Sequence, residues 1–272
     1  MPEGPEVTII RNSLDKLVKG KTLLEIEILK GGKYEKKSPD NYNLITEKLP
    51  LKVKGVYNKG KLMYWEFANG MYMINHLNMT GYWSINVSYK HSALRLNFKE
   101  KNLVLYYTDV RRFGRIEFLK SKVELKPILD KLGRDIVNDN NFTVNDFIEV
   151  AEKKKKQNIT KFLMDQSNVS GIGNYMKAEI LYQAKISPVR TVGSLSEEDL
   201  KNIYQATKRV AKSSLEWGGM SKSDYRDIDG KKGDFESLLK VYCKKKDPNG
   251  NPVSTLKTKD GRTTYWVEKV QI

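Results

Sequence analysis

A change in hydrophobic patterning constrains the fold of this 272-residue chain more than any other feature. Between residues 22 and 119, short apolar or alternating runs follow one another, and turn signals such as Gly31-Gly32 and Asn69-Gly70 separate several of them. The runs are TLLEIEIL, LKVKGVY, KLMYWEF, MYMINHL, ALRLNF and LVLYYTD. Regularly spaced short strands predict a β-sandwich or barrel.

Helical periodicity flanks this β-rich region on both sides. Before it, apolar residues at helical spacing predict a helix over about residues 5–18, which Gly20 ends. After it, helices are expected at about 143–155, 159–167, 174–185 and 196–217. Ser196 is the expected N-cap of the last of these. A short helical piece and a hairpin with turns at PNG and DG close the chain.

This order of elements predicts an α+β protein of two domains. Residues 1–122 form an N-terminal helix plus β-sandwich, and residues 123–138 form a linker marked by Pro127 and Gly133. Residues 139–234 form a helical domain, whose polar, glycine-rich stretch 218–234 reads as a loop. Residues 235–272 form the terminal hairpin.

Charge is the strongest signal in the composition. Lysine and arginine total 49 against 33 aspartate and glutamate, a net charge of +16. Such a field attracts polyanions, DNA above all, although lysines on ordinary solvated faces would give the same total. The sequence has no apolar run of about 18 residues and no signal-peptide pattern, so we expect no membrane partner and an intracellular, cytoplasmic or nuclear protein that is not secreted. The single Cys243 excludes an internal disulfide and a cysteine-rich zinc site.

The opening MPEGPEV has two interpretations. Prolines and acids suit a helix start, which is the structural interpretation of Pro5 and Glu6. If Met1 is removed, however, Pro2 is a free secondary amine beside Glu3, which is typical of a nucleophile with an acid/base partner.

Five further stretches carry candidate chemistry, each with a structural alternative. VSGIGNYMKAEIL places glycines before a helix, which suits either an oxyanion or a generic tight turn. YYTDVRRFG presents arginines beside Phe113 in an expected hairpin loop, where the ring could enter a base stack or fold into the core. Lys61 in NKGKLMYW, His76 and Met79 in NHLNMTG, and the basic tail hairpin each have a solvated or packed alternative.

The order of these motifs resembles that of the formamidopyrimidine-DNA glycosylase / endonuclease VIII family over residues 1 to about 270. The opening motif and the GIGN helix are highly specific to that family. The resemblance implies two domains with a helix–two-turn–helix motif, and an enzyme that removes oxidised bases from DNA by base flipping.

The resemblance also implies roles for individual residues. Pro2 matches the nucleophile, Glu3 the acid/base residue, Glu6 a second acidic position and Lys61 a phosphate-contacting lysine. The DNA-binding positions divide into three that fill the gap left by the everted nucleotide and three that contact the backbone. They are Met79, Arg111 and Phe113, and His76, Asn174 and Arg262, respectively. Residues 218–234 match a loop that closes over the damaged base in some members.

One departure concerns metal. Many members carry four zinc-binding cysteines in the tail hairpin, whereas this chain has only Cys243 and no histidine after His91. The tail resembles the zincless finger of animal endonuclease VIII-like and giant-virus members, so we expect no metal and no cofactor.

The resulting hypothesis is a monomeric, bifunctional DNA glycosylase and abasic-site lyase. It would excise oxidised pyrimidines, hydantoins and formamidopyrimidines from duplex or single-stranded DNA through a Schiff base at Pro2, followed by β- or β,δ-elimination. The alternatives are a non-catalytic damaged-DNA-binding relative, a tautomerase with a terminal proline base, and an RNA-binding protein, although no aromatic stacking motif on strands supports the last.

Overall fold

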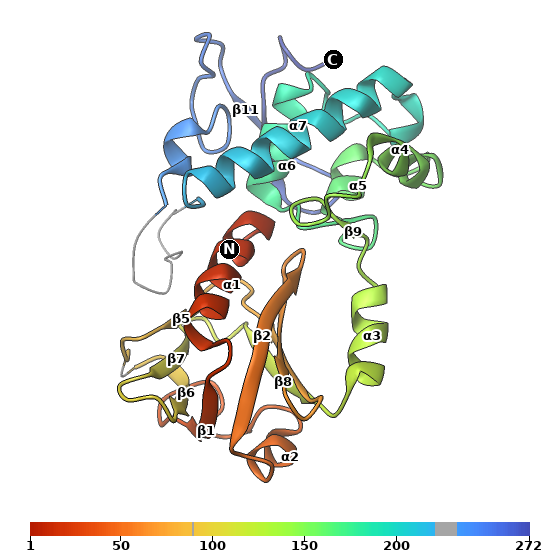
Figure 1. Ribbon diagram of the computed structural model, residues 1–272. Helices are drawn as coiled ribbons and strands as arrows, with labels where there is room; N and C mark the ends of the chain where they lie inside the picture. The colour runs from red at the N-terminus through yellow and green to blue at the C-terminus, as the bar shows by residue number, and fades with distance from the viewer. Residues whose placement is uncertain (89, 221–232) are drawn as a thin grey trace.

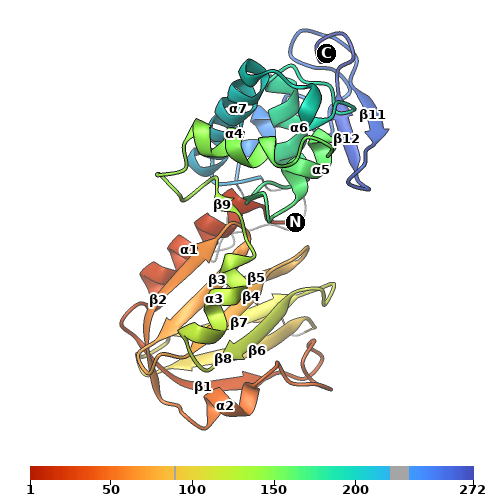
Figure 2. The same cartoon turned by 90° about the vertical axis from the view of Figure 1, so that its right-hand side faces the viewer.

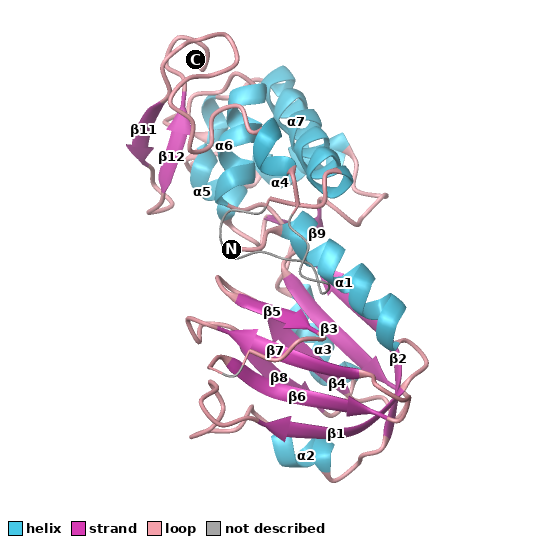
Figure 3. Ribbon diagram, turned by 90° about the vertical axis from the view of Figure 1, so that its left-hand side faces the viewer, coloured by secondary structure: helices cyan, strands magenta, loops and turns pink. Residues whose placement is uncertain are grey.

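The computed structural model describes residues 1–88, 90–220 and 233–272, which form two domains joined by a short connection (Figure 1). The first domain is built of strands flanked by helices, and the second is built of helices with a small hairpin at its edge (Figure 3). The predicted α+β architecture of two domains is confirmed.

The N-terminal domain is a β-sandwich, as predicted. Its strands run in the order β5-β7-β6-β1-β2-β3-β4-β8, and β1 and β2 share only two residue pairs. The two four-stranded halves therefore pack face to face around one core, where the rings of Trp65 and Trp83 lie 5.5 Å apart. The strands are β1 (Thr22–Ile28), β2 (Leu51–Lys59), β3 (Leu62–Phe67), β4 (Tyr72–His76), β5 (Gly81–Ser84), β6 (Ser92–Phe98), β7 (Val104–Asp109) and β8 (Arg115–Leu119).

Helix α1 (Gly4–Val18) lies along this sandwich and reaches the second domain (Figure 1). It buries Val7, Ile10, Leu14 and Val18 in the sandwich core, which confirms the predicted amphipathic helix. Its first turn points at the junction between the domains, so the start of the chain lies where the two domains meet.

The outer face of β3, β4 and β8 is covered by α3 (Lys122–Asp130), which the sequence pattern did not predict. Pro127 lies inside this helix and led us to expect a connector there. Leu125 is buried against the strands, so tertiary packing overrides the low helix propensity of proline. Helix α2 (Tyr42–Thr46) and strands β5 and β8 were also missed.

The second domain contains the four expected helices, somewhat shorter than predicted. They are α4 (Val144–Glu152), α5 (Ile159–Met164), α6 (Asn174–Gln183) and α7 (Glu197–Glu216), and β9 (Arg134–Asp135) and β10 (Val169–Ser170) pair beside them. Ser196 caps α7 as predicted, because its hydroxyl accepts a hydrogen bond from the Asp199 N–H at 3.1 Å.

The finger (residues 235–272) begins with a 3₁₀ turn, η2 (Phe235–Leu238), and ends with the antiparallel pair β11 (Ser254–Lys257) and β12 (Thr263–Trp266). The predicted hairpin is present, with the DG turn between its strands. The predicted loop at 218–234 falls largely on residues 221–232, outside the described residues.

Candidate active site

Pro2 and Glu3 are buried at the junction between the two domains (Figure 2). The Gly4 N–H donates to the Gly171 carbonyl at 2.8 Å, which ties the start of α1 to the segment before α6. The two stretches that were most specific in the sequence are therefore in direct contact in space.

The Glu3 carboxylate binds the N-terminus of α6. Its Oε1 accepts from the Tyr175 N–H at 3.0 Å and its Oε2 accepts from the Met176 N–H at 3.2 Å. Unpaired N–H groups and the helix dipole favour an anion at this position. At the Tyr175 and Met176 N–H groups, the oxyanion that the glycine motif was expected to hold is thus the chain's own carboxylate. Gly173 is required for this contact, since a Cβ at that residue would lie 2.1 Å from Glu3 Cδ.

Burial raises the pKa of Glu3 to about 7, even though Lys61 and the two backbone N–H groups act to lower it and Glu6 acts to raise it. A carboxyl group with this pKa exchanges a proton near neutral pH, as a general acid/base must. Lys61 follows Gly60 in the turn between β2 and β3, the position expected from its sequence. Burial lowers the pKa of Lys61, while Glu3 opposes that change.

Glu6 lies beside Glu3, but donors from the protein occupy its carboxylate. The Glu3 N–H, the Tyr175 hydroxyl, the Ser214 hydroxyl and the Met220 N–H bond to it at 2.8 to 3.0 Å. The first of these bonds serves the start of α1, in agreement with the helix-start interpretation of Glu6. The other three join α1 to α6, to α7 and to the residue that precedes the undescribed segment.

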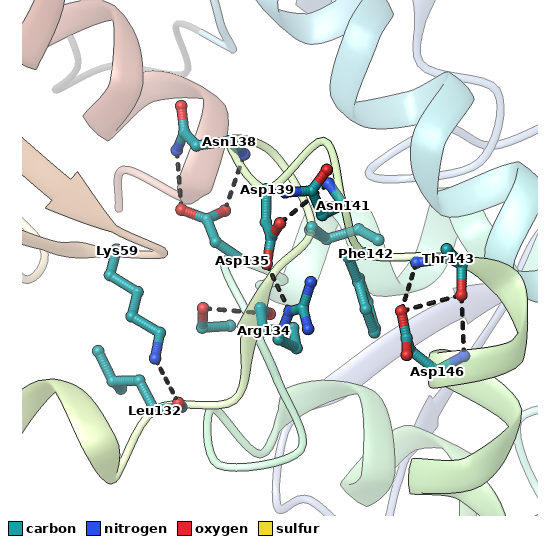
Figure 4. Close-up of polar contacts among 12 residues, drawn as sticks. Lys59, Leu132, Arg134, Asp135, Asn138, Asp139, Asn141, Phe142, Thr143 and Asp146 are labelled. Atoms are coloured by element: carbon teal, nitrogen blue, oxygen red, sulfur yellow. Dashed lines mark hydrogen bonds and ion pairs between the residues drawn. The ribbon is translucent and has the colours of Figure 1, made fainter.

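The turn that carries Lys61 is fixed by Asp135 in the connection between the domains. Figure 4 shows Asp135 bonded to Asn138, and Lys59 bonded to the Leu132 carbonyl. Asp135 Oδ2 accepts from the Gly60 N–H at 2.8 Å and from Asn138 Nδ2 at 2.8 Å. Lys59 donates to two carbonyls at the end of α3. Sequence reasoning missed Asp135, because nothing in its local sequence shows that it pairs with a turn 75 residues earlier.

Two loops at one end of the sandwich carry the other predicted residues of the first domain. One connects β4 to β5 and contains Met79, and the other connects β7 to β8 and contains Arg111 and Phe113. The second loop was expected to close a hairpin, but β7 pairs with β5 and β6 whereas β8 pairs with β4. Each loop therefore crosses between the two halves of the sandwich.

These crossings bring the three predicted gap-filling residues together. The Arg111 N–H donates to the Thr80 hydroxyl at 2.9 Å, and Asn78 Nδ2 donates to the Phe113 carbonyl at 2.5 Å. The Arg111 guanidinium lies 3.8 Å from Met79 Sδ. Met79 and Phe113 are exposed, by 37% and 57%, so their apolar side chains are available to a partner.

His76 ends β4 and is half-buried, and burial together with the nearby Arg115 lowers its pKa. Asn174 begins α6, and its Nδ2 donates to the Thr263 carbonyl of the finger at 3.1 Å. Arg262 projects from the exposed turn between β11 and β12.

The residues present do not fit the four-cysteine zinc site that the sequence resemblance raised for the tail hairpin. Cys243 is exposed and is the only cysteine, and both histidines lie in the N-terminal domain. Within residues 1–88, 90–220 and 233–272, no group of three or more histidine, cysteine, aspartate or glutamate side chains could hold a metal ion. No helix in the same ranges is long and apolar enough to cross a membrane.

A β-sandwich and a helical domain meet around the second residue, Pro2, and the buried Glu3 carboxylate. This arrangement is the one expected of a DNA glycosylase of the class that the sequence resembles. Family models match almost the whole chain: those for the N-terminal, H2TH and C-terminal domains of formamidopyrimidine-DNA glycosylase match residues 1–116, 132–226 and 226–272. The chain belongs to the formamidopyrimidine-DNA glycosylase family, which consists of DNA-binding glycosylases of base excision repair.

Relatives and solved structures agree with this assignment. The chain is 31% identical to the formamidopyrimidine-DNA glycosylases of Ligilactobacillus salivarius and Listeria monocytogenes, over all of this chain and 99% and 100% of theirs. It is similar to the MutM (Fpg) protein of Thermus thermophilus, with a TM-score of 0.87, 28% identity and coverage of 99% and 98% of the two chains. The Lactococcus lactis Fpg in complex with abasic-site DNA has a TM-score of 0.85, 25% identity and coverage of 99% of each chain.

Proposed function

We propose that this protein is a bifunctional DNA glycosylase and abasic-site lyase that uses Pro2 as its nucleophile. The observation that carries the proposal is the position of Glu3: a carboxyl group with a pKa of about 7 is buried one residue from the proline nitrogen. In the described chain Met1 precedes Pro2, so that nitrogen is part of a peptide bond. Removal of Met1 must therefore come before any chemistry.

The freed Pro2 nitrogen would attack C1′ of the damaged nucleotide while the base departs with a proton supplied by Glu3. The C1′–O4′ bond of the sugar ring then breaks, O4′ takes the proton that the amine has lost, and the nitrogen and C1′ form a cationic iminium. Loss of a proton from C2′ then expels the 3′ phosphate, which is β-elimination. A second elimination, after loss of the C4′ proton, would expel the 5′ phosphate.

The positions of the predicted DNA-binding residues are consistent with binding of a DNA duplex in which one nucleotide is turned out of the stack. Met79, Arg111 and Phe113 are assigned to the space that the nucleotide leaves. Lys61, His76, Asn174 and Arg262 are assigned to the backbone around the lesion.

The substrate class proposed is an oxidised base. Formamidopyrimidines come first, because similar proteins were solved with DNA that contains N7-benzyl-Fapy-dG or Fapy-dG. A complex of MutM with DNA containing carbocyclic 8-oxo-G adds this purine to the panel to be tested, with oxidised pyrimidines and hydantoins. The panel should present each lesion in duplex and in single-stranded form.

The decisive experiment is borohydride trapping on a duplex that contains one formamidopyrimidine or one abasic site, with peptide mapping of the adduct. We expect a covalent adduct on Pro2. A matched control carries one uncleaved residue before Pro2: it should bind the duplex and give no adduct. An adduct at another amine, or an equal adduct in the control, would refute the role of Pro2.

The non-catalytic alternative makes a different prediction for the same material. If the purified protein retains Met1 by mass spectrometry and binds abasic DNA without cutting it, the protein is a damaged-DNA-binding relative. If Met1 is absent and an adduct forms, that alternative is refuted.

A further inference from the structure

The finger is small and must be held to the rest of the protein by contacts other than a metal site. Its two paired strands have four residues each, too few to form a hydrophobic core of their own. Two buried carboxylates hold the finger to α6 through finger residues that precede the strand pair. Glu179 of α6 accepts from three consecutive backbone N–H groups at residues 240–242, and Asp247 accepts from the Tyr182 hydroxyl at 3.0 Å.

A third contact lies directly beside Arg262. Lys177 of α6 donates to Asp260 Oδ2 at 2.6 Å, and the two side chains are 0% and 4% exposed. Among the ion pairs of the described residues, this is the one in which both side chains are buried. Asp260 lies two residues before Arg262, in the turn between β11 and β12.

Hydrogen bonds within the turn connect Asp260 to the backbone of Arg262. The Thr258 hydroxyl donates to Asp260 Oδ1 at 2.5 Å, and the Thr258 N–H donates to the Arg262 carbonyl at 3.0 Å. The backbone of Arg262 is therefore fixed through Thr258 and Asp260, while its side chain remains exposed.

Stability alone does not explain a buried ion pair here, because apolar residues of similar volume usually stabilise such a position at least as well. Burial lowers the pKa of Lys177, and among the charges that act on it are Asp260, Glu3 and Arg262. The pair thus lies within electrostatic reach of both the acid/base carboxylate and the finger arginine.

We propose that Lys177 and Asp260 are positioning residues that hold the Arg262 turn against α6, so that the guanidinium meets the DNA backbone beside the lesion. This inference rests on the proposed function, since it requires that Arg262 contact DNA.

The test measures binding of the full-length protein to a duplex with a tetrahydrofuran abasic analogue, over a range of salt concentrations. Each phosphate contact contributes about 1 to the slope of log affinity against log salt concentration. We expect Arg262→Ala and Asp260→Asn each to lower the slope by about 1, and the double variant to lower it no further. If the two losses add to about 2, or if Asp260→Asn keeps the wild-type slope, the inference is overturned.

Two further variants keep the result interpretable. Lys177→Met/Asp260→Asn has no unpaired buried charge, so it should fold and still lack the Arg262 contribution; a folded protein with the wild-type slope would refute the proposal. Asp247→Asn removes a buried carboxylate from another part of the finger, so it should lower the melting temperature and leave the slope unchanged. If Asp247→Asn lowers the slope equally, general loosening of the finger explains the effect and the inference fails.

The outcomes also separate this inference from the proposed function. If the wild-type protein is trapped on abasic DNA while Arg262→Ala keeps its slope, the chemistry at Pro2 stands, and both the inference and the assignment of Arg262 to the DNA backbone fail. If the wild-type protein neither binds nor is trapped, both fail.

Discussion

The pKa of Glu3 provides the sharpest test of the site, because Glu3→Gln removes the titration. Burial raises this pKa from 4.5 to about 7 in the folded protein. At about 1.4 kcal/mol for each pH unit, the folded state favours the protonated form by roughly 3 kcal/mol more than the unfolded state does. The folded state therefore binds more protons between pH 4.5 and about 7. This contribution to stability is fully present below pH 4.5 and is lost as the pH rises through about 7.

The assay compares urea unfolding of the wild-type protein and Glu3→Gln at pH 4.5, 6, 7 and 8, both with one uncleaved residue before Pro2. Tryptophan fluorescence and far-ultraviolet circular dichroism should give coincident transitions. As the pH rises from 4.5 to 8, the wild-type protein should lose up to about 3 kcal/mol of unfolding free energy relative to Glu3→Gln, because glutamine does not titrate. Taking the difference cancels the titration of groups that the two proteins share.

Direct titration of the Glu3 carboxyl group can refute the claim that burial raises its pKa. In protein labelled with ¹³C at the glutamate carboxyl carbon, the resonance absent from Glu3→Gln should titrate near pH 7. Lys61→Met should raise that midpoint, since the positive charge of Lys61 lowers the pKa of Glu3. A midpoint near 4.5, together with a stability difference that does not change with pH, would refute the reasoning from burial.

Three further predictions concern other parts of the site. Gly173→Ala places a methyl group where Glu3 lies, so single-turnover base excision should fall by at least about 10²-fold, and near-normal excision would contradict the contact. Phe113→Ala should leave unfolding free energy within about 0.5 kcal/mol of wild type, because the ring is 57% exposed, yet slow excision from duplex DNA. Loss of stability with normal excision would show that Phe113 is only a packing residue. Tyr175→Phe removes a hydrogen bond to Glu6 and should cost about 1–3 kcal/mol in urea unfolding, and unchanged stability would show that this bond contributes nothing.

The sequence predicted those elements whose periodicity is local and strong. Helix α1 and three helices of the second domain, α4, α5 and α7, carry clear apolar spacing or caps, and six strands carry runs of at least six residues. Helix α6 has neither, and it was predicted from the glycines that precede Asn174. Strand β5 was missed because it has only four residues, and β8 because it directly follows the arginine-rich loop. Helix α3 was missed because Pro127 argues against a helix, and only packing against the sheet overrides that preference.

The candidate site was predictable to a similar degree. Motif order indicated Pro2, Glu3 and the loop residues as candidates, but no local signal revealed which group would occupy the N-terminus of α6. The Lys177–Asp260 pair joins residues 83 positions apart, and the Asp135–Gly60 contact joins residues 75 apart. Such contacts follow from the tertiary arrangement, and single-sequence periodicity contains no information about them.

The binding of Glu3 to α6 has a consequence for synthesis on the ribosome. Tyr175 lies 172 positions after Glu3, so at about 5–20 residues per second the two are separated by on the order of 10 to 30 s of translation. During that interval the helix that binds the carboxylate has not yet been synthesised. A nascent or prematurely terminated chain therefore carries Pro2 without the environment that raises the pKa of Glu3, and the proposed chemistry at Pro2 would require that the second domain has folded.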